Sequence, residues 1–240
     1  MSRRIDIRGV LVPNDYKWFY DWLGEDCTCP RDVQSILDDL EEGESVEVYI
    51  NSPGGVIDVG SEIYTALKMH ADQVKIYITG EACSAASIVA MAAYCEMSPT
   101  ALMMVHCVST CVAGNHNDME KTANVLQTAD HALCQAYVIK TGMSEDEAIE
   151  MMEQETWLTA AQALEKGLID GIMMQEQTEE KEALGAGPMF KLPTEEQLNS
   201  VRKMIEAKQE EEALADALSY SKERSLRNKL QYLALKGGEQ

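Results

Sequence analysis

Short apolar runs recur along the first half of the chain at positions that predict β-strands. These runs cover residues 46–50, 74–79 and 102–105, are rich in Val, Ile, Tyr and Met, and are bounded by turn residues. Side chains of this kind suit a pleated, partly buried surface. We therefore expect each run to be a strand of the core sheet.

Between and after these runs, apolar residues follow the spacing of an α-helix. Val33, Ile36, Leu37 and Leu40 mark one such stretch. Further helices are predicted over residues 57–70, 84–94 and 118–139, and after the capping boxes at 144–147 and 159–162. Strands that alternate with helices in this order predict an α/β layered fold built from βαβ units with crossover helices.

The last quarter of the chain has a different pattern. A stretch containing Gly185 and Pro188 breaks the helical pattern, and a capping box at residues 194–197 then opens a charged segment with a sparse apolar stripe. We therefore predict a main domain over 1–174, a polar linker containing Gly and Pro over 175–193, and a charged helical tail over 194–240. Such a narrow stripe predicts a tail that packs on a partner or on the main domain, or that is partly disordered.

Composition and charge exclude several classes of function. With 240 residues and 45% hydrophobic content the chain can bury one sizeable core. Its formal net charge of -21 would repel phosphate backbones and anionic lipid, so we expect neither nucleic acid nor membrane as a partner. The polar start of the chain resembles no signal peptide, and no apolar run approaches membrane-spanning length, which predicts a cytoplasmic protein.

The seven cysteines suit a reducing compartment better than a disulfide framework, because their number is odd and they lie in apolar segments. Cys27 with Cys29, and Cys107 with Cys111 and His116, could be imagined as metal ligands. Neither spacing matches a known ligand pattern, so we predict no metal.

Three segments carry residue types suited to acyl transfer. Residues 51–55, Asn-Ser-Pro-Gly-Gly, follow a predicted strand and could expose backbone N–H groups, although an ordinary turn would use the same residues. Ser84 lies where a helix should begin, so it could be a nucleophile near the positive end of the helix dipole or simply an N-cap. His106 ends the third strand, where it could be a base or a core histidine.

These segments, together with the stretch TWLTAAQALEKGLID at 156–170, resemble the proteolytic subunit of the Clp protease, ClpP. The matching pieces are YINSPGGV at 49–56, GEACSAA at 80–86 and MMVH at 103–106, in the family's order, so the resemblance spans residues 50–170. It implies a ClpP/crotonase-like layered fold with a long protruding helix, and a serine endopeptidase that needs no cofactor. It also implies an assembly of stacked rings.

The resemblance assigns a role to each matching position. Ser84 corresponds to the nucleophile, His106 to the general base, and the backbone N–H groups of Gly55 and Ala85 to the oxyanion hole. Glu155 stands where the family has the aspartate of its triad. A glutamate can orient a histidine as an aspartate does, but it is longer by one methylene, so Asp170 is kept as an alternative third member.

Other features concern biology more than chemistry. The aromatic segment around residues 16–22 does not match the family's pore loop or its unfoldase surface, which makes an AAA+ unfoldase a doubtful partner. A ClpP-like core with a charged helical extension resembles the phage and prophage branch, the head maturation proteases. Peptide or protein substrates, including capsid or scaffold protein, are therefore expected. The helix over 118–139 should join the rings, because its apolar positions exceed those of an ordinary surface helix.

Four alternatives remain at this point. A crotonase-type acyl-CoA enzyme shares the fold, a Ser-Lys peptidase would need a lysine near Ser84, and a catalytically silent scaffold would keep the fold alone. Cys83 or Cys107 could also be the nucleophile, although both resemble buried apolar groups.

Overall fold

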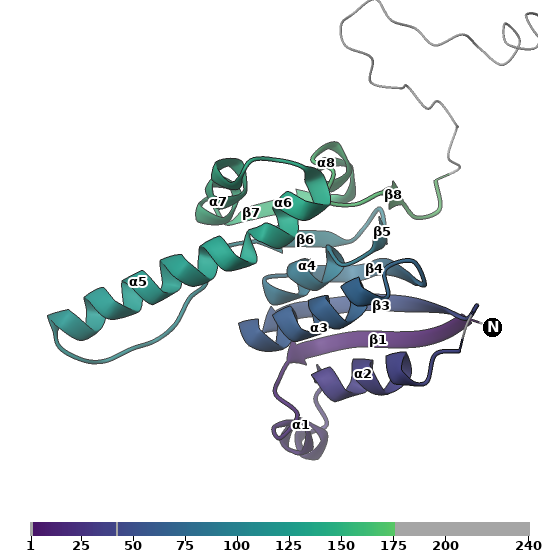
Figure 1. Cartoon of the computed structure of the whole chain (residues 1–240), viewed down its shortest axis with the longest axis horizontal. Helices are drawn as coiled ribbons and strands as arrows, with labels where there is room; N and C mark the ends of the chain where they lie inside the picture. The colour runs from purple at the N-terminus through teal and green to yellow at the C-terminus, as the bar shows by residue number, and fades with distance from the viewer. Residues whose placement is uncertain (1, 42, 176–240) are drawn as a thin grey trace, which may run out of the picture. The chain divides into compact units, whose positions relative to one another are not determined.

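The structure is a computed structural model that describes residues 2–41 and 43–175 (Figure 1). Apart from Gln175, the linker expected over 175–193 and the helical tail expected over 194–240 lie outside these residues. Within them, strands and helices alternate, and the α/β fold predicted from the sequence is confirmed. No helix in this part of the chain is long and apolar enough to cross a membrane.

An 8-stranded sheet forms the centre, in which six strands lie in the order β2-β1-β3-β4-β5-β8. The bounds are β1 Ser2–Leu11, β2 Cys27–Thr28, β3 Ser45–Gly55, β4 Val74–Cys83, β5 Tyr94–Met97 and β8 Gly171–Ile172. Two strands branch from this path: β6 Leu102–Val105 pairs with the end of β4, and β7 Thr156–Thr159 pairs with β6. Every pair is parallel except β6 with β7.

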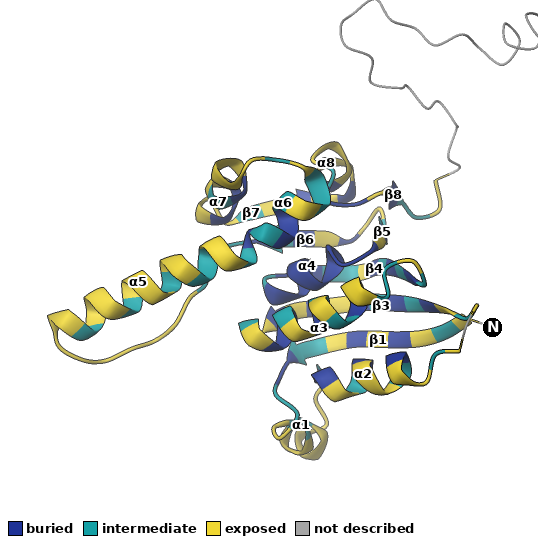
Figure 2. Cartoon of the chain, viewed as in Figure 1, coloured by how far each residue is buried: buried dark blue, intermediate teal, exposed yellow. Residues whose placement is uncertain are grey.

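Parallel strands need crossover connections, and helices supply them here. Figure 1 shows α2 Pro30–Asp38, α3 Ile57–Met69 and α4 Ala85–Ala90 side by side over one face of the sheet, with α3 between the other two. Alternate strand residues point into this layer and are buried, as in Ile5 and Ile7 of β1 and Ile76 and Ile78 of β4 (Figure 2). The helix α4 is buried along its whole length.

The predicted strands are confirmed, and two are longer than expected. The strand β3 continues through Gly55, so residues 51–55 are not the turn that the sequence suggested. Val10 and Leu11 of β1 pair with Gly54 and Gly55, and this ladder keeps the segment extended. In the same way β4 continues to Cys83 by pairing with β6.

Five strands of the sheet were missed or misassigned: β1, β2, β5, β7 and β8. The polar start of the chain forms β1, because Ile5 and Ile7 alternate with charged residues that point to the other face. The helix predicted over 84–94 ends at Ala90, and residues 94–97 form β5 instead, since they pair with β4. The strand β8 is only two residues long and has no periodicity to detect.

The long helix predicted over 118–139 is divided at Cys134 into α5 His116–Leu133 and α6 Gln135–Thr141. Figure 1 shows α5 projecting away from the sheet, and none of its residues is buried. In contrast, Ala136 and Tyr137 of α6 are buried in the body. The division therefore marks the point at which the helix leaves the core. We call α5 the helix arm.

Of the three predicted capping boxes, the two within the described residues are confirmed, and the one at 194–197 lies outside them. Ser144 and Glu147 exchange side-chain and backbone hydrogen bonds at the start of α7 Glu145–Glu153. Thr159 and Gln162 do the same at the start of α8 Ala160–Glu165. The aromatic segment forms the short helix α1 Lys17–Leu23, which has no buried residue.

Candidate active site

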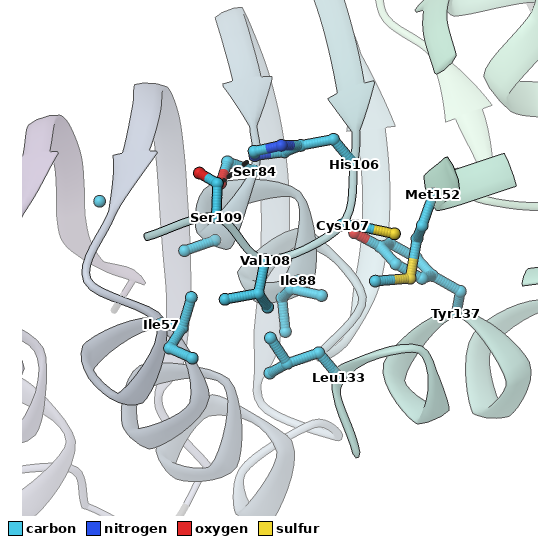
Figure 3. Close-up of a pocket in the computed structure, with 12 residues that line it drawn as sticks. Ile57, Ser84, Ile88, His106, Cys107, Val108, Ser109, Leu133, Tyr137 and Met152 are labelled. Carbon is cyan, nitrogen blue, oxygen red and sulfur yellow. Dashed lines mark hydrogen bonds between the residues drawn. The ribbon is translucent and has the colours of Figure 1, made fainter. Parts of the chain in front are cut away.

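Three parallel strands bring the sequence-predicted residues to one edge of the sheet. Ser52 of β3 pairs with Ala82 of β4, and Cys83 of β4 pairs with Met104 of β6. The carboxyl ends of parallel strands meet at one edge, which is the usual place for ligands in α/β folds. Gly55, Ser84 and His106 consequently line one pocket (Figure 3).

Ser84 joins β4 to α4 in an unusual backbone conformation. Its φ of 54° and ψ of -127° are rarely adopted by a residue with a side chain. The Ser84 amide donates to Met104 O at 2.9 Å, which ties this turn to β6. Its side chain makes no capping hydrogen bond to the helix, so the N-cap interpretation does not account for the Ser84 hydroxyl.

The Ser84 hydroxyl instead contacts His106. Oγ of Ser84 lies 2.8 Å from Nε2 of His106, as Figure 3 shows by a dashed line. For the hydroxyl to donate in this pair, the ring proton must be on Nδ1, which leaves Nε2 as the acceptor. In this geometry the imidazole can remove the hydroxyl proton as the oxygen attacks an electrophile.

The structure does not bring either proposed third member of the triad to His106. Glu155 accepts a hydrogen bond from Nε1 of Trp157 at 3.4 Å, and its backbone has a positive φ of 47°. Within the described residues, no hydrogen bond joins its carboxylate to His106. The pairing of Val105 with Thr156, continued by one residue, nevertheless sets Glu155 opposite His106 across β6 and β7. The register therefore points Glu155 toward the level of His106, while its carboxylate is hydrogen-bonded to Trp157.

Asp170 makes structural contacts away from His106. Its carboxylate accepts the amide of Cys95 at 2.7 Å and forms an ion pair with Lys140. Lys140 also donates to Ala93 O at 2.8 Å. These contacts fasten β8 to α6 and to the start of β5, so Asp170 is not an alternative orienting group for His106.

Glycine is required beside the serine for steric reasons. Gly54 has a φ of 94°, and a Cβ built on it would lie 2.6 Å from Cys83 O and 2.8 Å from Cβ of Ser84. The strand β3 can therefore approach the nucleophile turn only without a side chain at this position. The neighbouring Gly55 lines the pocket together with Ala85, which is the first residue of α4. The first N–H groups of a helix have no intrahelical acceptor, so the Ala85 N–H is suited to bind an anion.

Apolar side chains line one part of the pocket, and Ser109 lines it near the Ser84–His106 pair. Figure 3 shows aliphatic and aromatic side chains from several elements gathered below the Ser84–His106 pair. They belong to Ile57, Ile88, Leu133, Tyr137 and Met152. The pocket can therefore hold an apolar side chain next to the serine.

The two cysteines that flank the pair are poor nucleophiles. Burial, with help from Glu81, raises the pKa of the Cys83 thiol to about 12. Burial and the neighbouring Asp130 raise the pKa of the Cys107 thiol to about 11. Because the thiolate is the reactive form, both groups are largely unreactive at neutral pH. The cysteine alternative is therefore disfavoured, and the described lining of the pocket contains no lysine for a Ser-Lys pair.

Two polar residues near the serine were not singled out from the sequence. Ser87 and Tyr137 are buried, their hydroxyl groups lie 2.7 Å apart, and the Ser87 hydroxyl donates to Ser84 O. They are 50 residues apart along the chain. The sequence holds one weak signal for the pair, a serine within the otherwise apolar stretch that became α4.

Comparison with known proteins gives a consistent assignment. The family model described as Clp protease matches residues 33–176, which is more than half of the chain. The chain is 31% identical to the ATP-dependent Clp protease proteolytic subunit 1 of Protochlamydia amoebophila, over 57% of this chain and 69% of the relative. A proteolytic subunit from Bacteroides fragilis is likewise 31% identical, over 58% and 69%. This protein therefore belongs to the Clp protease family and is a serine-type peptidase, a hydrolase.

Proposed function

We propose that Ser84 is the nucleophile and His106 the general base of an endopeptidase that works through an acyl-enzyme. The observation that carries the proposal is the 2.8 Å contact between Ser84 Oγ and His106 Nε2 at the mouth of an apolar pocket. His106 takes the hydroxyl proton while Ser84 Oγ bonds to the substrate carbonyl carbon. His106 then gives that proton to the leaving amine as the peptide C–N bond breaks, and water releases the acyl group by the reverse route.

The oxyanion of the tetrahedral intermediate would be held by backbone N–H groups of Gly55 and Ala85. Both residues line the pocket beside Ser84, and Ala85 begins α4. Donors of this kind typically lower the barrier by about 3 kcal/mol each, because they meet a charge that forms only during the reaction.

Glu155 is the proposed partner of His106 Nδ1. Its support is the strand register, which sets it opposite His106, and its position in the family motif. The carboxylate would have to exchange the 3.4 Å contact with Trp157 for a contact with His106. Catalytic hydrogen bonds are often incomplete without substrate, so we expect this change when a peptide binds.

The pocket lining also supports a proposal about which side chain precedes the cleaved bond. Ile57, Leu133 and Met152 offer no charged or strongly polar group to the space beside Ser84. We therefore expect cleavage after apolar side chains, since a charged side chain would lose its hydration there without a partner.

The first test is mass spectrometry of the intact protein after treatment with a fluorophosphonate. We expect one adduct on the wild type, mapped to Ser84, and no adduct on Ser84→Ala. His106→Ala should label at least a hundredfold more slowly, because the serine would lack its base. A folded wild-type protein that forms no adduct would refute the proposal and favour a catalytically silent scaffold.

The helix arm supports assembly into a homo-oligomer, which we propose to be stacked rings. The arm carries exposed apolar side chains, among them Met119 and Val125. Figure 1 shows that it meets the core near its C-terminal end, where α6 follows. Burying these apolar side chains against another copy of the chain would remove them from water and stabilise the assembly.

For the biological role we propose processing of capsid or scaffold protein during phage head maturation. Its support is the combination of a ClpP-like core with a charged C-terminal segment in the sequence. The names of the relatives describe ATP-dependent proteases, which favours a second candidate: proteolysis of substrates delivered by an AAA+ unfoldase. Purified protein that cleaves folded capsid precursor without ATP would support the first role, and a strict need for an unfoldase would support the second.

A further inference from the structure

The carbonyl group of Ser84 is held by two hydrogen bonds from one residue. Ser87 donates its backbone N–H to Ser84 O at 2.9 Å, as expected in the first turn of a helix. Its hydroxyl also donates to the same oxygen, at 2.6 Å. The second bond is additional to anything that the helix itself requires.

Tyr137 of α6 completes the arrangement from the other side. Its hydroxyl lies 2.7 Å from Oγ of Ser87, and both side chains are almost fully buried. The direction of this bond follows from counting protons. A serine hydroxyl has one proton, and that of Ser87 is used on Ser84 O, which can only accept. Tyr137 must therefore be the donor to Ser87.

Tyr137 keeps that proton over the whole working range of pH. Burial raises the pKa of its hydroxyl far above the ordinary value for tyrosine. The direction of donation is consequently fixed: Tyr137 donates to Ser87, and Ser87 donates to Ser84 O. We call these three groups the hydroxyl relay.

The relay acts on the peptide that joins Ser84 to Ala85, and both of these residues line the pocket. The Ser84 carbonyl and the Ala85 N–H belong to the same planar trans peptide, so fixing the oxygen also fixes the direction of the N–H. Donors to a carbonyl oxygen also polarise the amide and strengthen its N–H as a donor. Ser84 has a strained φ of 54°, and the surrounding contacts must hold it there.

We propose that Tyr137, acting through Ser87, positions and polarises the Ser84–Ala85 peptide so that the Ala85 N–H stabilises the oxyanion. This inference rests on the proposed function, in which Ser84 is the nucleophile and Ala85 an oxyanion donor. Tyr137 and Ser87 are positioning residues, because neither hydroxyl touches the reacting atoms. The ring of Tyr137 has a separate role as a wall of the pocket.

The test is the kinetics of labelling by a fluorophosphonate with an apolar substituent, over a range of probe concentrations. Such data separate the limiting rate constant, kinact, from the concentration for half-saturation, KI. Tyr137→Phe keeps the ring and loses the hydroxyl, so we expect kinact to fall about threefold to tenfold with KI unchanged. Ser87→Ala removes the direct bond to Ser84 O and should lower kinact by about tenfold to a hundredfold.

If the two hydroxyl groups act in series, the double variant has a predictable rate constant. If Tyr137 acts only through Ser87, adding Tyr137→Phe to Ser87→Ala should lower kinact no further. A matched control is Thr28→Val, which removes a buried hydroxyl that bonds the backbone of Arg8 in a different part of the sheet. We expect its kinact to equal that of the wild type.

The outcomes separate positioning from general loss of structure. A loss of folded protein lowers the final amount of adduct, whereas a misplaced oxyanion donor lowers the rate constant of the sites that do react. Tyr137→Phe with wild-type kinact would overturn the relay and leave the proposed function intact, as would additive effects in the double variant. Absence of labelling in folded wild type would refute the proposed function itself, and the inference with it.

Discussion

Gly54 sets a strict steric limit at the nucleophile, because its α-carbon lies against the Ser84 turn. We predict that Gly54→Ala abolishes fluorophosphonate labelling, since the added Cβ would lie 2.6 Å from Cys83 O and 2.8 Å from Cβ of Ser84. Thermal denaturation should also show a loss of about 2 kcal/mol or more in the free energy of unfolding, from strain and overpacking together.

Gly24 provides the matched control for this substitution. Its φ of 75° is also positive, but no atom lies within 4 Å of a Cβ placed there. Gly24→Ala should therefore cost about 1 kcal/mol from backbone strain and leave labelling unchanged. Equal effects of the two substitutions on labelling would show that contact with Ser84 is not what position 54 requires.

The site was only partly predictable at the residue level. Ser84 and His106 could be identified because their types, their positions at strand ends and their motifs agree, and the structure brings them together. Ser87 and Tyr137 could not be paired in advance, since their contact depends on how α6 packs against α4. The direction of the Glu155 side chain could not be predicted either, because a strand register fixes the position of the backbone and not the side-chain rotamer.

At the level of elements, Glu155 directly precedes β7 and Asp170 directly precedes β8, and the sequence allowed either carboxylate as the partner of His106. We predict that Glu155→Gln lowers the labelling rate constant by about a hundredfold or more, because the amide cannot stabilise the imidazolium that forms. The free energy of unfolding should change little, since Glu155 is exposed and forms one weak hydrogen bond.

Asp170→Asn should behave in the opposite way. It breaks the ion pair with Lys140, whose side chain is only 10% exposed, and we expect a loss of about 1–3 kcal/mol in the free energy of unfolding. Labelling of the folded protein should proceed at the wild-type rate. If Asp170→Asn labelled slowly and Glu155→Gln labelled at the wild-type rate, the proposed roles of the two carboxylates would be reversed.

The elements that the sequence predicted correctly share a strong local signal. Short runs rich in Val, Ile, Tyr and Met predicted β3, β4 and β6, and reciprocal capping boxes predicted the starts of α7 and α8. The elements that were missed depend on pairing partners. Tyr94–Met97 becomes a strand because β4 lies beside it, and β8 is held by β5 and by the Asp170 carboxylate. Such contacts override local propensity and leave little trace in a single sequence.

At the scale of the whole molecule, the helix arm is the longest helix in the described part of the chain, and none of its residues is buried. Val125 is 66% exposed in the middle of the arm. We predict that the wild type is an oligomer by light scattering and that Val125→Glu shifts it toward smaller species, because a charge at a buried interface loses its hydration.

Asn124→Glu places the same charge one residue away, on a neighbouring exposed position of the arm. It should alter the assembly less than Val125→Glu if apolar contact is what joins the copies. A wild-type monomer at micromolar concentration would contradict the proposed assembly directly.

The hydrogen bond from the Ser84 amide to Met104 O has a consequence for how the enzyme would lose activity. Met104 lies in β6, and His106 directly follows the last residue of that strand, so this hydrogen bond helps to set the spacing of nucleophile and base. If β4 and β6 separate, both groups move apart at once. The rate of fluorophosphonate labelling therefore measures local unfolding. As the urea concentration rises, this rate should fall when β4 and β6 separate, whether or not the rest of the sheet has unfolded.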